Sequence, residues 1–320
     1  MQFEIIYLII GMFGLWIGSG IVVEHGEKIA KSLNISSRVV GLTVASLGSS
    51  LGEMLTNVVA GLRRNQGIEA SGIAFGTIIG SNISLITFVL GFCGLFTVYY
   101  LERKKKSMKR DWTMLLIAII LMFLFSLDGV ISIFEGILLI SAYGFYFLVV
   151  LKQEEVFDKV IDAHHNHKSF IPKTILSLSA LFVGVLIAIY SANLIVDNGV
   201  EIANSFRIQT VLIGILVGFS TSLPELTISL RAILRGAHGL SIGNIVGGNI
   251  VDPLLSLGLG AFIAPIKVDK ISLWFDVPFV FFATLLALIF FKRGGKLDKI
   301  EASALIGVYV LFLVLKFFII

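Results

Sequence analysis

The hexapeptide Gly48-Ser49-Ser50-Leu51-Gly52-Glu53 places a carboxylate in the middle of an otherwise uncharged apolar segment. A near-copy, Ser220-Thr221-Ser222-Leu223-Pro224-Glu225, puts a second carboxylate in the same setting 172 residues later. A carboxylate at bilayer depth is unfavourable by roughly 2.5–3.5 kcal/mol, so it is retained where a cation or a partner group compensates its charge. Two such acids in one repeated motif predict a shared site for a multivalent cation or for several cations.

The composition around these motifs indicates an integral membrane protein. Hydrophobic residues make up 57% of the chain and charged residues 14%, and the mean hydropathy is +0.97. Most apolar runs exceed the 18 residues that a spanning helix needs. We therefore predict an all-α membrane protein with ten transmembrane helices, at about residues 3–23, 38–62, 72–98, 112–127, 130–151, 173–196, 208–233, 241–265, 272–291 and 301–319.

The basic residues predict the orientation, because cytoplasmic loops carry an excess of Lys and Arg. With the N-terminus outside, 19 of the 25 Lys and Arg residues fall in cytoplasmic loops, six of them within 103–110. The other six are Arg63, Arg64, Arg207, Lys267, Lys270 and Lys316. We expect a multi-pass protein of the cell membrane with both termini extracellular. We attribute the net charge of +4 to the basic residues that orient the protein in the membrane, and not to nucleic-acid binding.

The chain also repeats itself outside the acid motifs. Glu24-His25-Gly26 corresponds to Asp197-Asn198-Gly199 at an offset of 173, and Gly80-Ser81-Asn82-Ile83 corresponds to Gly247-Gly248-Asn249-Ile250 at 167. Each half holds five predicted spans, and an odd number makes the second half insert upside down. We predict two inverted five-helix repeats, 1–151 and 173–320, joined by a cytoplasmic linker at 152–172, with broken helices meeting near the midplane. The predicted helix breaks lie at the two acid motifs and at residues 80–82 and 247–249.

The doubled acid motif, followed in each half by Gly-X-Asn-Ile, resembles the two alpha repeats of the cation/calcium antiporters, and most nearly the prokaryotic sodium/calcium exchangers. The resemblance covers both halves. It implies a secondary active antiporter that exports Ca²⁺ in exchange for Na⁺ by alternating access. It further implies that Glu53 and Glu225 bridge a central Ca²⁺, assisted by the backbone carbonyls of Ser49 and Thr221. Hydroxyl groups would form Na⁺ sites, and these map to Ser50, Ser81 and Ser222.

Three further polar residues are candidate ligands because of their positions in the sequence. Asp252 is a third acid in an apolar span, directly before Pro253, and Asn82 and Asn249 lie at the predicted helix breaks. The full set of predicted metal ligands is Glu53, Glu225, Ser49, Thr221, Ser50, Ser222, Ser81, Asp252, Asn82 and Asn249. Compared with the family pattern, Leu85 and Gly248 each remove an oxygen ligand, and Gly52 replaces a frequent proline. These departures affect the predicted sodium sites.

The ligand chemistry limits the alternatives. Carboxylate, hydroxyl and carbonyl oxygens suit hard cations such as Ca²⁺, and neither Cys nor His accompanies the motif. No span holds a nucleophile with a base or a zinc motif, so we expect no enzyme activity and no cofactor. Proton-driven antiport of Ca²⁺ or another divalent cation stays open, with H⁺ as the coupling ion; a cation channel fits less well. Neither a protein partner nor a metal site at His164, His165 and His167 is expected.

Overall fold

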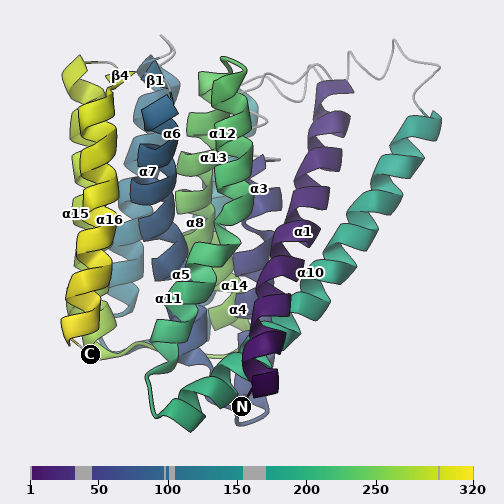
Figure 1. Cartoon of the computed structure of the whole chain (residues 1–320), viewed down its shortest axis with the longest axis vertical. Coiled ribbons are helices and arrows are strands. Elements are labelled where there is room, and N and C mark those ends of the chain that lie inside the picture. The colour runs from purple at the N-terminus through teal and green to yellow at the C-terminus, as the bar shows by residue number, and fades with distance from the viewer. Residues whose placement is uncertain are drawn as a thin grey trace.

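The computed structural model describes residues 2–32, 45–96, 99–100, 105–153, 171–294 and 296–319. Within them the chain forms a bundle of helices that run roughly along one axis, with both termini at the same end (Figure 1). Several sequence predictions fall outside the described residues: the start of the second span at 38–44, almost all of the linker 152–172, and the three histidines within it.

The structure is built almost entirely of helix. The α-helices are α1 (Gln2–Ser32), α3 (Ser46–Ser49), α4 (Leu51–Asn65), α5 (Ser71–Ile83), α6 (Leu90–Phe96), α7 (Lys105–Phe125), α8 (Ile133–Gln153), α10 (Ile171–Phe206), α11 (Thr210–Thr221), α12 (Leu223–Leu234), α13 (His238–Val251), α14 (Leu257–Ile263), α15 (Val277–Gly294) and α16 (Lys299–Ile319). Three segments are π-helical: η2 (Ser84–Val89), η3 (Asp252–Ser256) and η4 (Ser272–Asp276). Four two-residue strands complete the fold: β1 (Tyr99–Tyr100), β2 (Val130–Ile131), β3 (Ile266–Lys267) and β4 (Lys296–Leu297).

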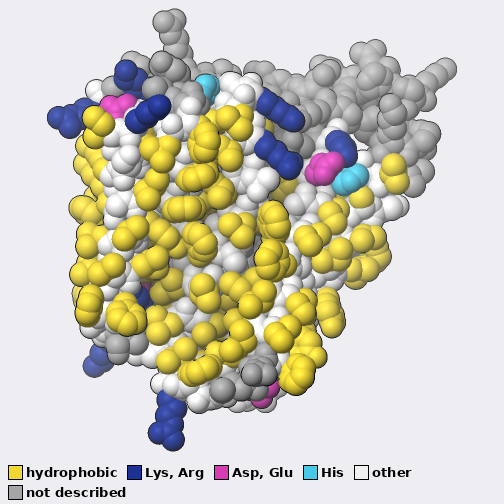
Figure 2. All heavy atoms as spheres, viewed as in Figure 1, with side chains coloured by type: hydrophobic (Ala, Val, Ile, Leu, Met, Phe, Trp, Pro, Cys, Tyr) yellow, Lys and Arg dark blue, Asp and Glu magenta, His cyan; other side chains and the backbone are white. Residues whose placement is uncertain are grey.

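Eight stretches of the described helices are long and apolar enough to cross a membrane. They are Phe3–His25, Ser71–Phe96, Ile133–Gln153, Leu176–Phe206, Thr210–Leu234, His238–Ile263, Ser272–Arg293 and Lys299–Ile319. The second predicted span is divided at Ser50, and the helix of the fourth carries Lys109, Arg110 and Asp111 near its start. Figure 2 shows hydrophobic side chains over most of the visible flank and charged side chains mainly at the two ends. The chain is therefore a helical, multi-pass membrane protein.

The short strands form two ribbons that join the first half of the chain to the second. β1 pairs antiparallel with β4, with Tyr99 opposite Leu297, and β2 pairs antiparallel with β3, with Ile131 opposite Ile266. Figure 1 shows the β1–β4 ribbon at the end of the bundle away from the two termini. Each ribbon satisfies backbone groups at a helix connection, which would otherwise need water or side-chain partners.

The last helix of each half begins with a capping box. At α8, Ser132 and Glu135 bond reciprocally, since each backbone N–H donates to the side chain of the other residue. At α16, Asp298 and Glu301 form the same arrangement, 166 residues later. Each box satisfies two of the backbone donors that a helix N-terminus leaves without partners. The repeated sequence therefore produces a repeated local structure.

Glycines let α5 and α11 approach closely enough to fix the polar centre of the bundle. A Cβ at Gly80 would overlap the backbone of Ile215, and a Cβ at Gly218 would overlap the backbone carbonyl of Thr77.

The prediction that residues 80–82 and 247–249 break their helices is wrong. The α-helix continues through both segments and turns π-helical only at Ser84 and at Asp252. Gly80 serves close packing there, which needs no change of helical backbone.

A buried ion pair connects the last two helical spans. The Nζ atom of Lys316 lies 2.6 Å from Oδ2 of Asp276, and the two side chains are 3% and 0% exposed. Lys316, which we counted among the six basic residues outside the cytoplasmic loops, therefore has a buried charge partner within the bundle. Its side chain turns into the bundle because a fully buried carboxylate on η4 offers it a charged partner.

Candidate cation-binding site

The two acid motifs break their helices at equivalent positions, as predicted. Helix α3 ends at Ser49 and α4 starts at Leu51, while α11 ends at Thr221 and α12 starts at Leu223. The intervening residues have near-identical backbones, with φ −72° and ψ 8° at Ser50, and φ −79° and ψ 0° at Ser222. Each acid therefore lies in the first turn of a new helix, and the carbonyls of Ser49 and Thr221 lie at the end of the preceding one.

Three carboxylates are fully buried in this region. Glu53, Glu225 and Asp252 are each 0% exposed. Among the residues that the structure describes, none of the four side-chain oxygens of Glu53 and Glu225 has a hydrogen-bond partner, and neither does Oδ1 of Asp252. A buried carboxylate without partners costs several kcal/mol, which bound cations can offset. These oxygens are the strongest indication of a cation site in the described chain.

Hydroxyl groups surround each carboxylate and come partly from the opposite half of the chain. Thr221 and Ser81 lie beside Glu53, and Ser49 lies beside Glu225, although none reaches hydrogen-bond geometry with these acids. Ser81 donates a 2.7 Å hydrogen bond to Oδ2 of Asp252. Glu53 and Asp252 are also close enough to Glu225 for their charges to interact. The three acids and these hydroxyls thus lie in one polar region, in which the acids are within range of one another's charges.

A chain of serines continues this polar centre. The Ser84 hydroxyl donates to that of Ser222 at 2.8 Å, and Ser222 lies 3.3 Å from the Ser81 hydroxyl. Sequence reasoning missed Ser84. Its signal was its position three residues after Ser81, which places both on one face of a helix. The Ser50 hydroxyl is buried without a partner in the described chain.

The predicted amide ligands leave one oxygen each without a partner. Asn82 donates its Nδ2 to the carbonyl of Ile78 at 2.9 Å, and Asn249 donates to that of Ile245 at the same distance. Both side-chain carbonyl oxygens are buried and lack partners within the described residues. The amides therefore stabilise their own helices and still offer an oxygen to a cation.

Two further asparagines hold the backbone of the acids, and sequence reasoning missed both. Asn57 donates to the backbone carbonyl of Glu53 at 3.1 Å, one helical turn away. Asn244 donates to that of Glu225 at 3.3 Å and accepts a 3.3 Å bond from the Ser49 hydroxyl. The spacing of Asn57 from Glu53 was a usable signal, whereas the contact of Asn244 with Glu225 joins two different helices.

The positions that depart from the family pattern contribute no side-chain oxygen here. Leu85 is fully buried in η2. A Cβ at Gly248 would lie 3.0 Å from Cδ1 of Leu85 and 3.6 Å from Oγ of Ser50. The Ser49 and Thr221 hydroxyls donate to carbonyls of their own helices, Ala45 and Gly218. For Ser49 and Thr221 the candidate ligand atom is therefore the backbone carbonyl oxygen.

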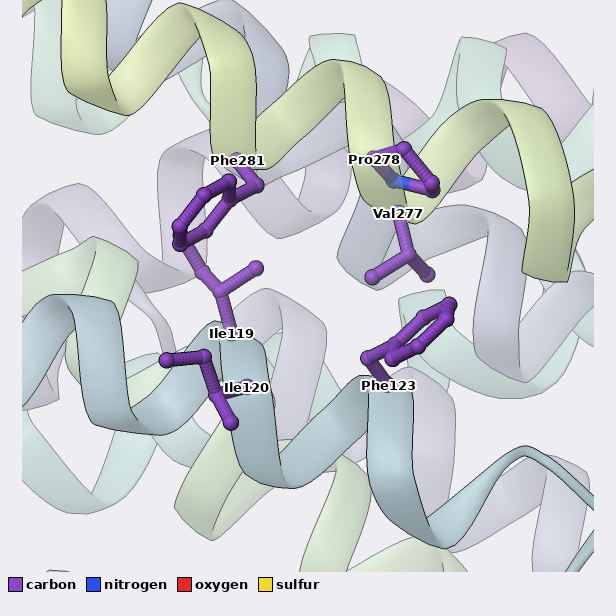
Figure 3. A pocket seen from close by; sticks show the side chains of 6 residues that line it. All are labelled: Ile119, Ile120, Phe123, Val277, Pro278 and Phe281. Atoms are coloured by element: carbon purple, nitrogen blue, oxygen red, sulfur yellow. The ribbon is translucent and has the colours of Figure 1, made fainter.

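No three His, Cys, Asp or Glu residues of the described chain form a compact metal-binding group. A hard cation here would need hydroxyl and carbonyl oxygens in addition to the acids, and the surroundings supply both. A separate cavity of about 210 Å³ between α7 and α15 is unsuited to this role. It is lined entirely by hydrocarbon side chains, among them Ile119, Phe123 and Phe281 (Figure 3).

Buried acids on broken helices inside an apolar bundle define a membrane transporter for cations. Comparison with known proteins identifies the family of this transporter. The sodium/calcium exchanger protein family matches residues 3–152 and 176–318, and the chain belongs to this family. It is a sodium/calcium antiporter and not an enzyme.

Similar proteins span nearly the whole chain. A sodium/calcium exchanger of Methanosarcina acetivorans is 26% identical, with 98% of each chain covered. An uncharacterised membrane protein of Methanocaldococcus jannaschii is 28% identical, with 95% of each covered. A solved structure of the sodium–calcium exchanger NCX_Mj, soaked with Na⁺ and Ca²⁺, matches with a TM-score of 0.68 at 27% identity and 98% coverage of both chains.

Proposed function

We propose that this antiporter exports Ca²⁺ in exchange for Na⁺ entry, and that Glu53 and Glu225 together bind the Ca²⁺ ion during alternating access. The observation that carries the proposal is the absence of hydrogen-bond partners for all four of their buried oxygens in the described chain. Two negative charges in an apolar bundle match one divalent cation. When Ca²⁺ leaves, Na⁺ ions compensate the same charges.

The remaining Ca²⁺ ligands come from groups next to the acids. Ca²⁺ takes about six to eight oxygen ligands, and the two carboxylates alone supply too few. The backbone carbonyls of Ser49 and Thr221 lie at the helix breaks, where a carbonyl can turn away from its helix. Asn82 and Asn249 each add a buried side-chain oxygen without a partner in the described chain.

The sodium sites use the hydroxyl network. Ser50, Ser81 and Ser222 lie among the three acids, and Asp252 supplies a charged oxygen that no described residue engages. Leu85 and Gly248 supply no oxygen, so we propose weaker Na⁺ binding, or fewer bound Na⁺ ions, than in relatives with polar residues at these positions.

We also propose that the chain forms ten transmembrane helices in two inverted repeats, 1–151 and 173–320, joined by a cytoplasmic linker at 152–172. Three repeated features support this arrangement. The capping boxes recur at an offset of 166, the segments η2 and η3 follow the equivalent helices α5 and α13, and each strand ribbon pairs one half with the other. Both termini would face the exterior, in accordance with the placement of the basic residues.

Flux measurements in proteoliposomes test the proposed site. An inward Na⁺ gradient at fixed pH should drive efflux of ⁴⁵Ca²⁺, and Glu53→Gln and Glu225→Gln should each abolish it. Asp128→Asn is the matched control, because Asp128 is an exposed acid in the turn after α7. Near-normal flux in either site variant would exclude that acid as a Ca²⁺ ligand.

A further inference from the structure

Outside the cation site, the sequence repeat relates two charged pairs, one at each end of the bundle. Arg63 follows Glu53 by ten residues, and Arg235 follows Glu225 by ten. Glu24 and Asp197 also correspond, at an offset of 173. Exchanging the two halves therefore turns the pair Arg63–Asp197 into the pair Arg235–Glu24. If the repeats were in identical conformations, both pairs would be formed or both would be open.

The first pair is formed. The guanidinium group of Arg63 donates to both carboxylate oxygens of Asp197, from Nε at 2.5 Å and from Nη2 at 2.7 Å. Nη2 also lies 3.2 Å from Oδ1 of Asn193. This two-point contact fixes the end of α4 to α10 and is the strongest geometry for an arginine–carboxylate pair. We call Arg63–Asp197 the outer latch, following the proposed orientation.

The second pair is open. Glu24 accepts a 2.7 Å bond from Lys28 on its own helix, and Arg235 makes no ion pair with any described residue. Glu24, Lys28, Arg231 and Arg235 all line a cavity of about 450 Å³ between α1 and α12, and Arg231 is close enough to Glu24 for their charges to interact. Figure 2 shows basic and acidic side chains near one another at the end of the bundle where α1 and α12 end in Figure 1. We call Arg235–Glu24 the inner latch.

The open cavity reaches toward the cation site. Pro224, the residue directly before Glu225, lines it together with the apolar residues Trp16 and Val23. Closing α12 onto α1 at Arg235 and Glu24 would reduce this space. The described conformation is therefore closed by an ion pair at the outer end and has a cavity at the inner end.

We propose that the two latches alternate, so that the inner latch forms when the outer latch opens, and that the four residues position α1, α4, α10 and α12 for transport without touching the cation. This inference rests on the proposed alternating access and orientation. A partly exposed ion pair shifts a two-state equilibrium by no more than about fivefold. A latch of that strength biases the conformation and still opens readily.

The sequence also explains why the inner latch is the open one. Lys28 lies one helical turn after Glu24 and competes with the arginines of the cavity, Arg231 and Arg235, for its carboxylate. The residue equivalent to Lys28 in the second half is Glu201, which cannot compete with Arg63 and repels Asp197 toward it. Removing the Lys28 charge should therefore shift the protein toward the closed inner end.

Labelling of a cysteine in the cavity tests this prediction. Thr227→Cys in a Cys93→Ala background places a thiol on the cavity wall, accessible to a membrane-impermeant reagent from the cytoplasmic side. Lys28→Ala should slow its labelling by up to about fivefold, and Arg63→Ala should do the same by releasing the outer latch. Lys267→Ala breaks the exposed ion pair with Glu69 elsewhere on the bundle and serves as the matched control. Unchanged labelling in Lys28→Ala and Arg63→Ala would overturn the proposal.

Cross-linking provides a second measurement. Cysteines replace Arg63 and Asp197, or Glu24 and Arg235, or all four, and a short bifunctional thiol reagent bridges each pair. We expect each bridge to block Ca²⁺ flux reversibly, and the four-cysteine protein to carry one bridge or the other. Both bridges in one molecule would contradict alternation. Flux by the Cys93→Ala parent separates the latch proposal from the proposed antiport function. If the parent transports Ca²⁺ and both bridges still form in one molecule, the latch proposal is wrong and the antiport function is unaffected.

Discussion

Ser81 on α5 and Asp252 on η3 are joined by a 2.7 Å hydrogen bond between residues 171 positions apart. The bond uses one carboxylate oxygen of Asp252 and leaves the other without a partner in the described chain. Asp252 is thus partly held by the protein, whereas Glu53 and Glu225 are not. This difference predicts different roles for the three acids of the proposed site.

Asp252→Asn should weaken coupling to Na⁺ more than it weakens Ca²⁺ binding. Losing a charged ligand contact of about 1.5–3 kcal/mol corresponds to roughly ten- to a hundredfold higher Na⁺ for half-maximal Ca²⁺ efflux. Efflux under an inward Na⁺ gradient, compared with an inward proton gradient without Na⁺, measures the effect. Efflux driven by protons alone and lost in Asp252→Asn would instead indicate a proton antiporter.

Glu53→Gln and Glu225→Gln should abolish stabilisation by Ca²⁺ while leaving the protein folded. A ligand that binds the native state raises the Tm, and at 100 times its Kd it contributes about 2.7 kcal/mol. Without Ca²⁺, removing a buried charge that lacks partners should preserve or raise the Tm. Thermal unfolding in detergent with and without Ca²⁺ checks both points. A Ca²⁺-dependent rise of normal size in these variants would place the ion elsewhere.

Gly80→Ala should impair folding or transport because its Cβ would overlap the backbone of Ile215 on α11. Overpacking of this kind costs about 1–3 kcal/mol. Gly144→Ala on α8 is the matched control, since a Cβ there meets no atom within 4 Å and alanine is the better helix former. The two variants are compared by Tm and by Ca²⁺ flux. Equal behaviour would show that the close approach of α5 and α11 has no energetic importance.

Lys316→Met should destabilise the protein by about 3–5 kcal/mol, because it leaves the Asp276 carboxylate buried without its cation. Adding Asp276→Leu should recover most of this loss, since an apolar pair of similar size replaces a buried ion pair at little cost. A double-mutant cycle of unfolding free energies measures the coupling. Additive effects would mean that the pair contributes no stability.

Cysteine labelling should place the loop of Arg63–Ile68 outside and position 105 inside. A membrane-impermeant thiol reagent applied to whole cells, in a Cys93→Ala background, should modify a cysteine at Gln66 and spare one at Lys105. Modification of both positions from outside would be incompatible with the proposed inverted repeats.

Much of the fold could be predicted from the sequence because its signals are local. Apolar runs long enough to span a bilayer predicted the helices, and Pro224 with its neighbours predicted a break that the structure places at Ser222. The repeated acids predicted buried carboxylates, and both are fully buried. The prediction of helix breaks at residues 80–82 and 247–249 was wrong. Glycine permits both a helix break and close helix packing, and only the neighbouring helix decides between them.

The sequence by itself determined the membrane class, the duplication and the identity of the buried acids, since each depends on residue type and spacing along one chain. Tertiary structure alone decided which groups on different helices meet. It brought Ser81 to Asp252, Asn244 to the backbone of Glu225, and Lys316 to Asp276. It also decided that Arg63 pairs with Asp197, while Arg235 has no ion pair with a described side chain. Charges far apart in sequence interact only when packing brings them within a few ångströms, and that packing depends on the whole bundle.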